Sequence, residues 1–431
     1  MSTRTPPFSR RSFLLGAASL TTVPLLASCV GSGAGGGTGG GGGATTLTLQ
    51  SSIQDTGPKA ALEGLVAAFD GQPVTLNSVA TEQFRAQLST YLSSATPPDV
   101  LAWYAGSVAN SYAEEGLLLD VSDLWAPGGA CAGFSDALRA LSTSADGKAI
   151  FVPTNYYWWS VFYKKSAFQQ WGVQPPTTWD EFIALCDGLK ARGVHPLTNG
   201  IGSTAWMSAG WFDYLNLRVN GATYHRELLA GKHSFEDPQV TAVLEQYARL
   251  VPYFHPNQTS WDSQQAVTPM VNNEAAMYLA GAFCVQYFPA DQRDDLDFFS
   301  VPTIDPSVPS AEEAPTDGFF AAANSQNPEG AKQLLSYLAS PPVQQEYVQK
   351  SGSSNLPTSP DVDTSQFSPL VKKGIQLLND TDEITQFFNR DSSDALQTTA
   401  DAALTQFIAN PSDIRGIQRQ WQQAAQQVFS S

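Results

Sequence analysis

The sequence has few of the residues that build metal centres, disulfide frameworks or nucleic-acid surfaces. Its 431 residues include 4 histidines and 4 cysteines, and 23 lysines and arginines stand against 40 aspartates and glutamates. No run of like charge and no basic patch occurs, so phosphate backbones would be repelled. Nucleic acid is therefore not expected as a partner.

Motifs for catalysis are also missing. The four histidines, His195, His225, His233 and His255, show no metal-binding spacing such as H-E-x-x-H, and no nucleophile elbow of the G-x-S-x-G type occurs. His195, in ARGVHPL at the exit of a predicted helix, is interpreted as structural. We expect a protein that is not an enzyme and needs neither a metal nor a cofactor.

A long hydrophobic run is lacking as well. The stretch Phe13–Ala27 is about fifteen residues long, too short to span a bilayer comfortably, and Arg10 and Arg11 precede it. Residues 1–28 are therefore interpreted as a signal peptide. It ends in LLASC, which resembles the lipobox of bacterial lipoproteins with Cys29 as the acylated residue, and SRRSFL resembles a twin-arginine export signal. The alternative is an ordinary N-terminal helix that ends near a chance cysteine.

A glycine-rich segment follows the lipobox. Residues 29–44 contain GSGAGGGTGGGGGA, a flexible coil that reaches very roughly 20 Å, and we interpret them as a tether. Removing the three leader arginines from the 23 basic residues leaves 20 against 40 acidic residues, so an anionic membrane does not attract the body. We expect an exported protein, held on the outer face of the cytoplasmic membrane by lipid alone. Cys131, Cys186 and Cys284 remain, which allow at most one internal disulfide.

The chain beyond the tether is globular and alternates strand and helix signals. With 42% hydrophobic and 15% charged residues it is long enough for two or more lobes. Strands are predicted over 45–51, 73–79 and 97–103, with helices over 58–70 and 81–94 between them, which indicates a parallel α/β lobe. Further helices are predicted over 177–193, where Thr178 and Glu181 form a capping box, and over 237–251 and 327–340. No internal repeat is found.

One segment is unusually aromatic. In NYYWWSVFYKKSAF, residues 155–168, six of the eight residues from Tyr156 to Tyr163 are aromatic. A strand here would present rings on both faces, because successive side chains of a strand alternate. One face can enter a core, and the other requires a different apolar partner.

Six segments in order resemble a known family. They are SATPPDVLAWYAGSVANSYAEEGLLLDV, VPTNYYWWSVFYKKSAFQQWGVQPPTTWDEF, WFDYLNLRVNG, EAAMYLAGAF, VPTIDPSVPSAEEAPTD and FFNRDSSDAL. Together they look like the sugar-binding lipoproteins of bacterial ABC importers, of the maltodextrin type, and most like binders of α-glucosides and related hexose derivatives. The resemblance covers nearly the whole mature chain.

This resemblance implies an α/β fold, a two-lobed periplasmic-binding-protein clamp with a sugar in the cleft between its lobes. Three chain crossings are expected, near Pro153, Pro302 and Asn324. The N-terminal lobe would comprise 45–153 plus 303–323, and the C-terminal lobe 154–302 plus 324–431. A monomer would close on a mono- or oligosaccharide and deliver it to the ABC permease subunits, which a cytoplasmic ATPase drives.

Candidate ligand-binding residues follow the strand signals. Ligands of open α/β sheets sit beyond the carboxyl ends of strands. The first strand is followed by Gln54 and Asp55, and the third ends in Trp103 and Tyr104. A pyranose has apolar faces and a polar rim, so its binder needs flat rings with polar groups at their edges.

The aromatic segment supplies two more candidates. We expect Tyr157 and Trp158 to face the sugar, and Phe162 to enter the core. The competing interpretation is that the whole stretch packs in the core and the hinge.

Further aromatic candidates lie later in the chain. Trp206 lies in a loop bounded by glycine and serine and suits a stacking platform, whereas Trp211 is predicted to be core. Phe283 occupies the position at which the resemblance implies a tryptophan against the sugar. Phe319, in TDGFF, could instead serve packing, and Asp317 could instead cap a turn.

FFNRDSSDAL contains the last candidates. Arg390 can donate several hydrogen bonds to adjacent hydroxyls or to an anionic substituent, and Asp391 can accept from hydroxyls or hold the arginine in place. The alternative is a surface ion pair. The resemblance implies Asp-Arg-Asp here, and Asn389 departs from it, which leaves the identity of the sugar open.

Two other functions fit parts of the sequence. A secreted glycoside hydrolase also uses aromatic rings with a carboxylate pair about 5–10 Å apart. A surface scaffold or adhesin lipoprotein fits the tether but leaves the clustered aromatic residues without a role. The sequence does not define which sugar is bound, its linkage, its length or whether it carries a charged group.

Overall fold

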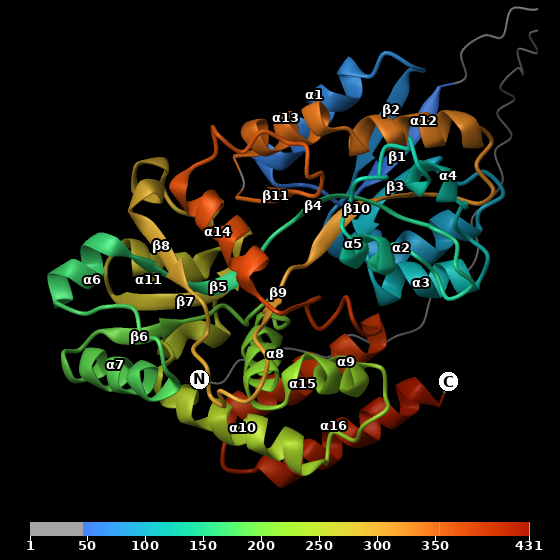
Figure 1. The fold of residues 1–431 in the computed structure, drawn as a ribbon. Helices are drawn as coiled ribbons and strands as arrows, with labels where there is room; N and C mark the ends of the chain where they lie inside the picture. The colour runs from blue at the N-terminus through green and yellow to red at the C-terminus, as the bar shows by residue number, and fades with distance from the viewer. Residues whose placement is uncertain (1–45, 353, 431) are drawn as a thin grey trace, which may run out of the picture. The chain divides into compact units, whose positions relative to one another are not determined.

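A computed structural model describes residues 46–352 and 354–430. The predicted signal peptide, Cys29 and the whole tether lie outside the described residues. The described chain contains three β-sheets: two larger ones, each with helices packed against it, as Figure 1 shows, and a two-stranded one. The expected two-lobed α/β architecture is confirmed.

The first lobe is built on a six-stranded sheet with strand order β11-β4-β10-β3-β1-β2. β1 pairs in parallel with β2 and β3, whereas β10 runs antiparallel to β3 and β4. The three predicted strands correspond to β1, β2 and β3. The strands are β1 (Leu47–Ser51), β2 (Val74–Ser78), β3 (Val100–Tyr104), β4 (Val152–Tyr156), β10 (Thr316–Ala321) and β11 (Leu356–Pro357).

Both faces of this sheet are covered, because successive side chains of each strand point to opposite sides. Val100 and Ala102 belong to one hydrophobic cluster, while Leu101 and Trp103 belong to another. The helices of this lobe are α1 (Thr56–Ala68), α2 (Thr81–Ser93), α3 (Ser107–Glu114), α4 (Ser122–Trp125), α5 (Asp136–Leu141), α12 (Pro328–Ala339) and α13 (Pro341–Ser351).

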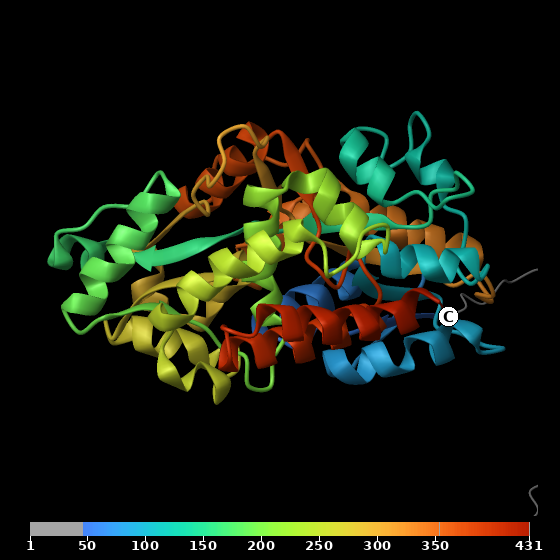
Figure 2. The ribbon, with the colours of Figure 1, turned by 90° about the horizontal axis from the view of Figure 1, so that it is seen from below.

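The second lobe is built on a four-stranded sheet with strand order β6-β7-β5-β8. Trp211 is buried among the helices of this lobe, as predicted. The C-terminal helix α16 also belongs to this lobe and is drawn in red in Figure 2. The strands of this lobe are β5 (Trp159–Lys164), β6 (His195–Thr198), β7 (Ala275–Gly281) and β8 (Leu296–Phe299). Its helices are α6 (Lys165–Trp171), α7 (Trp179–Ala191), α8 (Met207–Val219), α9 (Gly221–Leu229), α10 (Pro238–Leu250), α11 (Thr268–Val271), α14 (Pro369–Asp380), α15 (Asp394–Ala409) and α16 (Ile414–Phe429).

Local sequence signals explain several helix boundaries. Thr178 and Glu181 form the predicted capping box at the start of α7, in which each side chain satisfies the other residue's free N–H group. α10 and α12 both begin at a proline, which suits the first turn because its missing N–H has no partner there.

The chain crosses between the lobes at other places than expected. The first crossing lies at Tyr157 and Trp158, between β4 and β5, rather than near Pro153. The second crossing lies just before β10 rather than near Pro302. Residues 311–313 form the short strand β9 (Ala311–Glu313), which packs beside α8 and pairs with β12 (Glu383–Thr385), so the chain is still in the second lobe at this point.

The third crossing is also displaced. α12 and α13 follow Asn324 but contribute Leu334, Leu335 and Val343 to the core of the first lobe. Residues 324–351 therefore belong to that lobe, and the crossing lies after β11. The sequence suggested otherwise because the amphipathic pattern of these helices shows that one face is buried without showing against which sheet.

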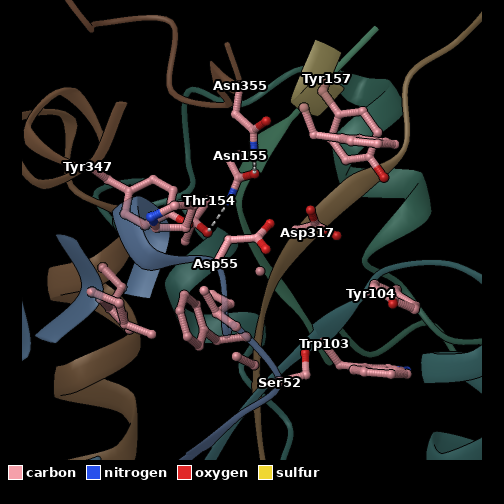
Figure 3. Close-up of a pocket in the computed structure, with 18 of the residues that line it drawn as sticks. Ser52, Asp55, Trp103, Tyr104, Thr154, Asn155, Tyr157, Asp317, Tyr347 and Asn355 are labelled. Carbon is pink, nitrogen blue, oxygen red and sulfur yellow. Dashed lines mark hydrogen bonds between the residues drawn. The ribbon is translucent and has the colours of Figure 1, made fainter. Parts of the chain in front are cut away.

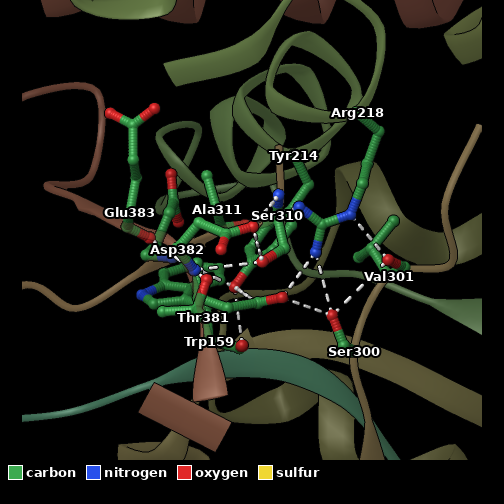
Figure 4. Close-up of polar contacts among 12 residues, drawn as sticks. Trp159, Tyr214, Arg218, Ser300, Val301, Ser310, Ala311, Thr381, Asp382 and Glu383 are labelled. Carbon is green, nitrogen blue, oxygen red and sulfur yellow. Dashed lines mark hydrogen bonds and ion pairs between the residues drawn. The ribbon is translucent and has the colours of Figure 1, made fainter. Parts of the chain in front are cut away.

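A buried polar network anchors the second crossing to α8 (Figure 4). Glu312 accepts hydrogen bonds from Arg218 at 2.6 Å, from Tyr214 at 2.9 Å and from Ser300 at 2.5 Å. Arg218 also donates to the carbonyl oxygens of Val301 and Ala311. Because every charged group here has a partner, the segment from 300 to 312 is fixed to the second lobe.

The remaining cysteines are free and buried. Cys131, Cys186 and Cys284 form no disulfide in the structure, and burial raises the pKa of the Cys131 thiol to about 12. Within residues 46–352 and 354–430, no helix has both the length and the apolar composition needed to cross a bilayer.

Candidate functional site

A cavity of about 260 Å³ opens where the first lobe meets segments of the second (Figure 3). Ser52, Gln54 and Asp55 approach it from the end of β1, and Trp103 and Tyr104 from the end of β3. The carboxyl ends of these parallel strands share one edge of the sheet, where ligands of α/β folds bind. Phe283, Gln286 and Arg390 are contributed by the second lobe.

Aromatic rings form much of the wall. Trp103 stacks on Tyr104 with their ring centroids 4.0 Å apart, and its other neighbour Phe84 lies at 4.8 Å. On the side of the second lobe, Tyr157 meets Phe283 edge to face at 5.5 Å. The cavity therefore offers flat apolar surfaces whose positions are fixed by other rings.

Arg390 is the central charged group of the cavity. Its guanidinium donates to Asp317 Oδ1 at 2.7 Å and to the Tyr157 hydroxyl at 2.8 Å. It also lies over the Tyr104 ring, 4.0 Å from the centroid. These contacts hold one arginine against both lobes and orient its remaining N–H donors.

Two glycines allow this arrangement. Gly106 has φ +95°, and a Cβ there would lie 2.6 Å from the Arg390 carbonyl oxygen, which accepts a hydrogen bond from Ser107 N. Gly318 follows Asp317 at a register shift between β10 and β4, where a Cβ would lie 2.1 Å from the Val152 carbonyl oxygen. The shift directs the Asp317 side chain into the cavity.

Two carboxylates face the cavity, and in Figure 3 they lie between the rings of Tyr347 and Tyr104. Burial raises the pKa of Asp317, which the Arg390 charge opposes. Burial likewise raises the pKa of Asp55, against a hydrogen bond from Gln286 Nε2 at 3.0 Å. That bond joins the first lobe to the second across the cavity.

Amide groups complete the polar lining. Asn355 Nδ2 donates to Asn155 Oδ1 at 2.6 Å, and Thr154 lies beside them. The arrangement presents hydrogen-bond donors and acceptors around aromatic faces. It can hold a polar ring molecule by its edge and its face together.

Nine predicted site residues line this cavity: Gln54, Asp55, Trp103, Tyr104, Tyr157, Phe283, Asp317, Phe319 and Arg390. The structure thus brings together residues that are more than 300 positions apart in the chain.

Trp158 is not among them, which corrects the prediction. Its side chain is 0% exposed and packs against Phe298, with ring centroids 5.2 Å apart, and against Gly374. The chain crosses between the lobes at this residue, so the alternation of a single strand does not continue from Tyr157 to Trp158. Phe162 is buried, as predicted.

Trp206 and Asp391 also lie outside the lining. Trp206 packs behind Phe283, with ring centroids 6.3 Å apart, and meets the edge of Phe387 at 5.6 Å. The Asp391 carboxylate accepts a hydrogen bond from Gln386 N at 3.1 Å, and burial raises its pKa to about 6. It fixes the turn that carries Arg390 rather than contacting the guanidinium.

The sequence reasoning missed several polar lining residues. Thr154 and Asn155 begin the aromatic segment, and their place just before the rings was the only available signal. Ser52 directly follows β1, so the position after a strand end could have indicated it. Nothing in the sequence pattern indicates the others, since they come from helices of the first lobe, from the residue before β11 or from the turn after β7. The missed polar and tyrosine residues are Ser52, Thr81, Thr154, Asn155, Gln286, Gln344, Tyr347 and Asn355.

Two lobes with a polar, aromatic cavity between them define a solute-binding clamp. Comparison with known proteins supports this class. The family model described as bacterial extracellular solute-binding protein matches residues 54–345, and the chain belongs to this family.

Individual relatives are consistent with this assignment. The chain is 23% identical over 395 residues to the alpha-glucosides-binding periplasmic protein AglE of Rhizobium meliloti, with 84% of each chain covered. An uncharacterized ABC transporter extracellular-binding protein of Pyrococcus horikoshii is 24% identical over 344 residues, which cover 76% of this chain and 74% of the relative. Among solved structures, the bacterial solute receptor AcbH matches with TM-score 0.84 and 30% identity over 90% of this chain and all of that chain. AcbH has an exclusive substrate preference for β-D-galactopyranose.

Proposed function

We propose that this protein is the substrate-binding component of a carbohydrate ABC importer, which captures a mono- or oligosaccharide and delivers it to a membrane permease. The observation that carries the proposal is the joining of aromatic faces with Arg390, Asp317 and Asp55 in one cavity. Sugar carbon faces stack on such rings, and the hydroxyl rim pairs with charged and amide groups. Relatives that bind α-glucosides and β-D-galactopyranose support this ligand class.

The small size of the cavity narrows the ligand. About 260 Å³ lies just below the range of about 300–1,000 Å³ that is common for ligand pockets. We therefore favour a single hexose, or one terminal hexose of a short saccharide, in the closed cavity. The site residues proposed to contact it are the nine predicted residues of the lining together with Asn155, Asn355 and Gln286.

Closure of the lobes provides the mechanism. Asp55 on the first lobe bonds to Gln286 on the second, and both line the cavity. A sugar that contacts both lobes favours the closed state by its differential affinity for that state. The closed form would then present both lobes to the permease, and the protein performs no chemistry on the sugar.

A thermal-shift panel tests the ligand class. We expect at least one of galactose, glucose and short α-glucosides to raise the melting temperature, because saturation at 100 times the dissociation constant adds about 2.7 kcal/mol of stability. Recovery of the sugar intact from the complex is expected. A hydrolysed sugar would instead establish a glycoside hydrolase, and no response to any saccharide would favour a scaffold lipoprotein.

We further propose lipid attachment at Cys29. In the native host, Cys29→Ala is expected to leave uncleaved precursor or to release the protein from the membrane, because stable anchoring requires acyl chains. Membrane fractionation measures the release, and Cys131→Ala serves as a control because that thiol is buried in the first lobe. Mass spectrometry that finds an unmodified Cys29 would contradict this proposal.

A further inference from the structure

Three ionisable side chains meet in the interior of the second lobe, outside the cavity lining. They are Asp213 on α8, His225 on α9 and Glu313 on β9. One nitrogen or oxygen atom from each lies within 4.8 Å of those of the other two, and Asp213 Oδ1 is 3.9 Å from His225 Nε2. All three residues are 0% exposed.

Asp213 and Glu313 are within hydrogen-bonding reach of each other if one of them carries a proton, and the polar atoms that face one another here have no hydrogen-bond partner outside the cluster. These atoms are both carboxylate oxygens of Glu313, Oδ1 of Asp213 and Nε2 of His225. In the described part of the chain, no lysine or arginine forms an ion pair with Asp213 or Glu313. Burying two carboxylates without a positive charge is costly, so this cluster requires either a proton shared between Asp213 and Glu313 or a bound cation.

The adjacent residue shows the contrast. Glu312 is also buried but is paired with Arg218, Tyr214 and Ser300, and Figure 4 labels these three partners. Arg218 is thus already paired with Glu312. Glu313 lies beside Asp213 and His225 instead, so its partner is either the Asp213 carboxyl group or a bound cation.

We propose that Asp213, His225 and Glu313 bind one divalent transition-metal ion, Zn²⁺ or Mn²⁺. Imidazole nitrogen with carboxylate oxygen is a ligand set that these ions accept. With metal–ligand distances of about 2.1 Å, ligand atoms of a tetrahedral site lie about 3.4 Å apart. The Asp213–His225 pair thus needs to close by only about 0.5 Å around the ion.

Asn216 would orient the histidine from the second coordination shell. Its amide lies 3.1 Å from His225 Nδ1 and also accepts a hydrogen bond from Asn220 at 2.7 Å. Metal binding requires that Nδ1 carries the proton and that the Asn216 amide turns its oxygen toward it, with Asn220 turning as well. Nε2 then presents its lone pair to the ion, as is usual for histidine ligands.

The site lies behind the proposed sugar cavity. Glu313 precedes Asp317 by a few residues, and Asp213 Oδ2 accepts a hydrogen bond at 2.9 Å from Phe388 N, close to Arg390. A bound ion would therefore fix both segments that carry the central ion pair of the cavity. This last consequence rests on the proposed sugar-binding function, whereas the metal site itself does not.

The test measures metal content without any sugar. The mature protein is unfolded with guanidinium and a chelator, refolded with Zn²⁺, with Mn²⁺ or without metal, desalted and analysed by inductively coupled plasma mass spectrometry. We expect about one ion per chain, which resists chelators until the protein unfolds, because the buried ligands form a site only in the folded state. His225→Gln and Glu313→Gln are each expected to weaken retention by more than about 100-fold.

His233→Gln is the matched control. His233 also lies beside two carboxylates, Glu227 at 3.1 Å and Asp237 at 3.9 Å, but it is partly exposed to solvent. It should keep full metal content. Refolded wild-type protein with less than about a tenth of an ion per chain would overturn the proposal, even if the variants fail to fold. A second result would also overturn it: a Glu313→Gln protein that is more stable than metal-free wild type and whose stability does not change when metal is added. That result would indicate a proton shared between the two carboxyl groups instead of a metal ion.

Discussion

Replacing Trp158 with alanine is expected to lower the free energy of unfolding by about 3–5 kcal/mol, because the substitution removes a large buried ring and leaves a cavity. The indole is fully buried against Phe162 and Phe298 and lines no part of the sugar cavity. Calorimetry on the folded fraction should accordingly find unchanged affinity for the cognate sugar. Denaturant unfolding of the apo protein measures the stability.

Gly374 provides the control for this assignment. A Cβ at Gly374 would lie 2.5 Å from the Trp158 ring, so Gly374→Ala should destabilise the wild-type protein. In the Trp158→Ala background the same change should be neutral or favourable, because the methyl group then fills space that the ring has left. Loss of sugar affinity in folded Trp158→Ala, with its stability intact, would place the ring in the binding site instead.

Replacing Arg390 with methionine is expected to have the largest effect on binding. Methionine fills a similar length but removes the donors to Asp317, Tyr157 and the proposed sugar. Hydrogen bonds to charged groups contribute about 1.5–3 kcal/mol, so affinity should fall roughly 10- to 150-fold. Isothermal titration calorimetry with the sugar identified by the thermal-shift panel measures the change.

A control variant at Arg139 distinguishes the loss of a ligand contact from the general effect of removing an arginine. Arg139 also lies over a ring, 5.2 Å from the Trp125 centroid, and donates to the Trp125 carbonyl, but it lies outside the cavity lining. Arg139→Met should leave affinity unchanged. Asp317→Asn combined with Arg390→Met should recover stability by removing the unpaired carboxylate without restoring affinity. Wild-type affinity in Arg390→Met would remove the guanidinium from the site.

Many helices and strands were predictable because short sequence patterns determine where they begin and end. The capping box at Thr178, the prolines at helix starts and the alternation of the first strands all correspond to observed elements. The lobe membership of α12 and α13 was not predictable. The sequence pattern of an amphipathic helix shows that one face is buried, but only the tertiary structure determines which sheet covers that face.

The candidate site was likewise predictable only where a local sequence pattern indicates the position of a residue. Residues directly after strands, such as Asp55 and Tyr104, were found because parallel strands end at a common edge. Trp158 was misplaced because alternation along one strand assumes that the strand stays in one sheet, and here the chain leaves the sheet at this residue. Tyr347 lies on a helix surface whose direction toward the cavity only packing determines.

The antiparallel strand β10 imposes an order on biosynthesis. It lies between β3 and β4 in the first sheet, and Gly318 pairs with Trp103, so the middle of that sheet is absent until the ribosome has made more than two hundred further residues. Until then β3 and β4 have exposed edges, which attract other strands. The N-terminal lobe thus completes its core only after the body of its partner lobe has emerged, and a nascent chain of this topology depends on protection from aggregation for most of its translation.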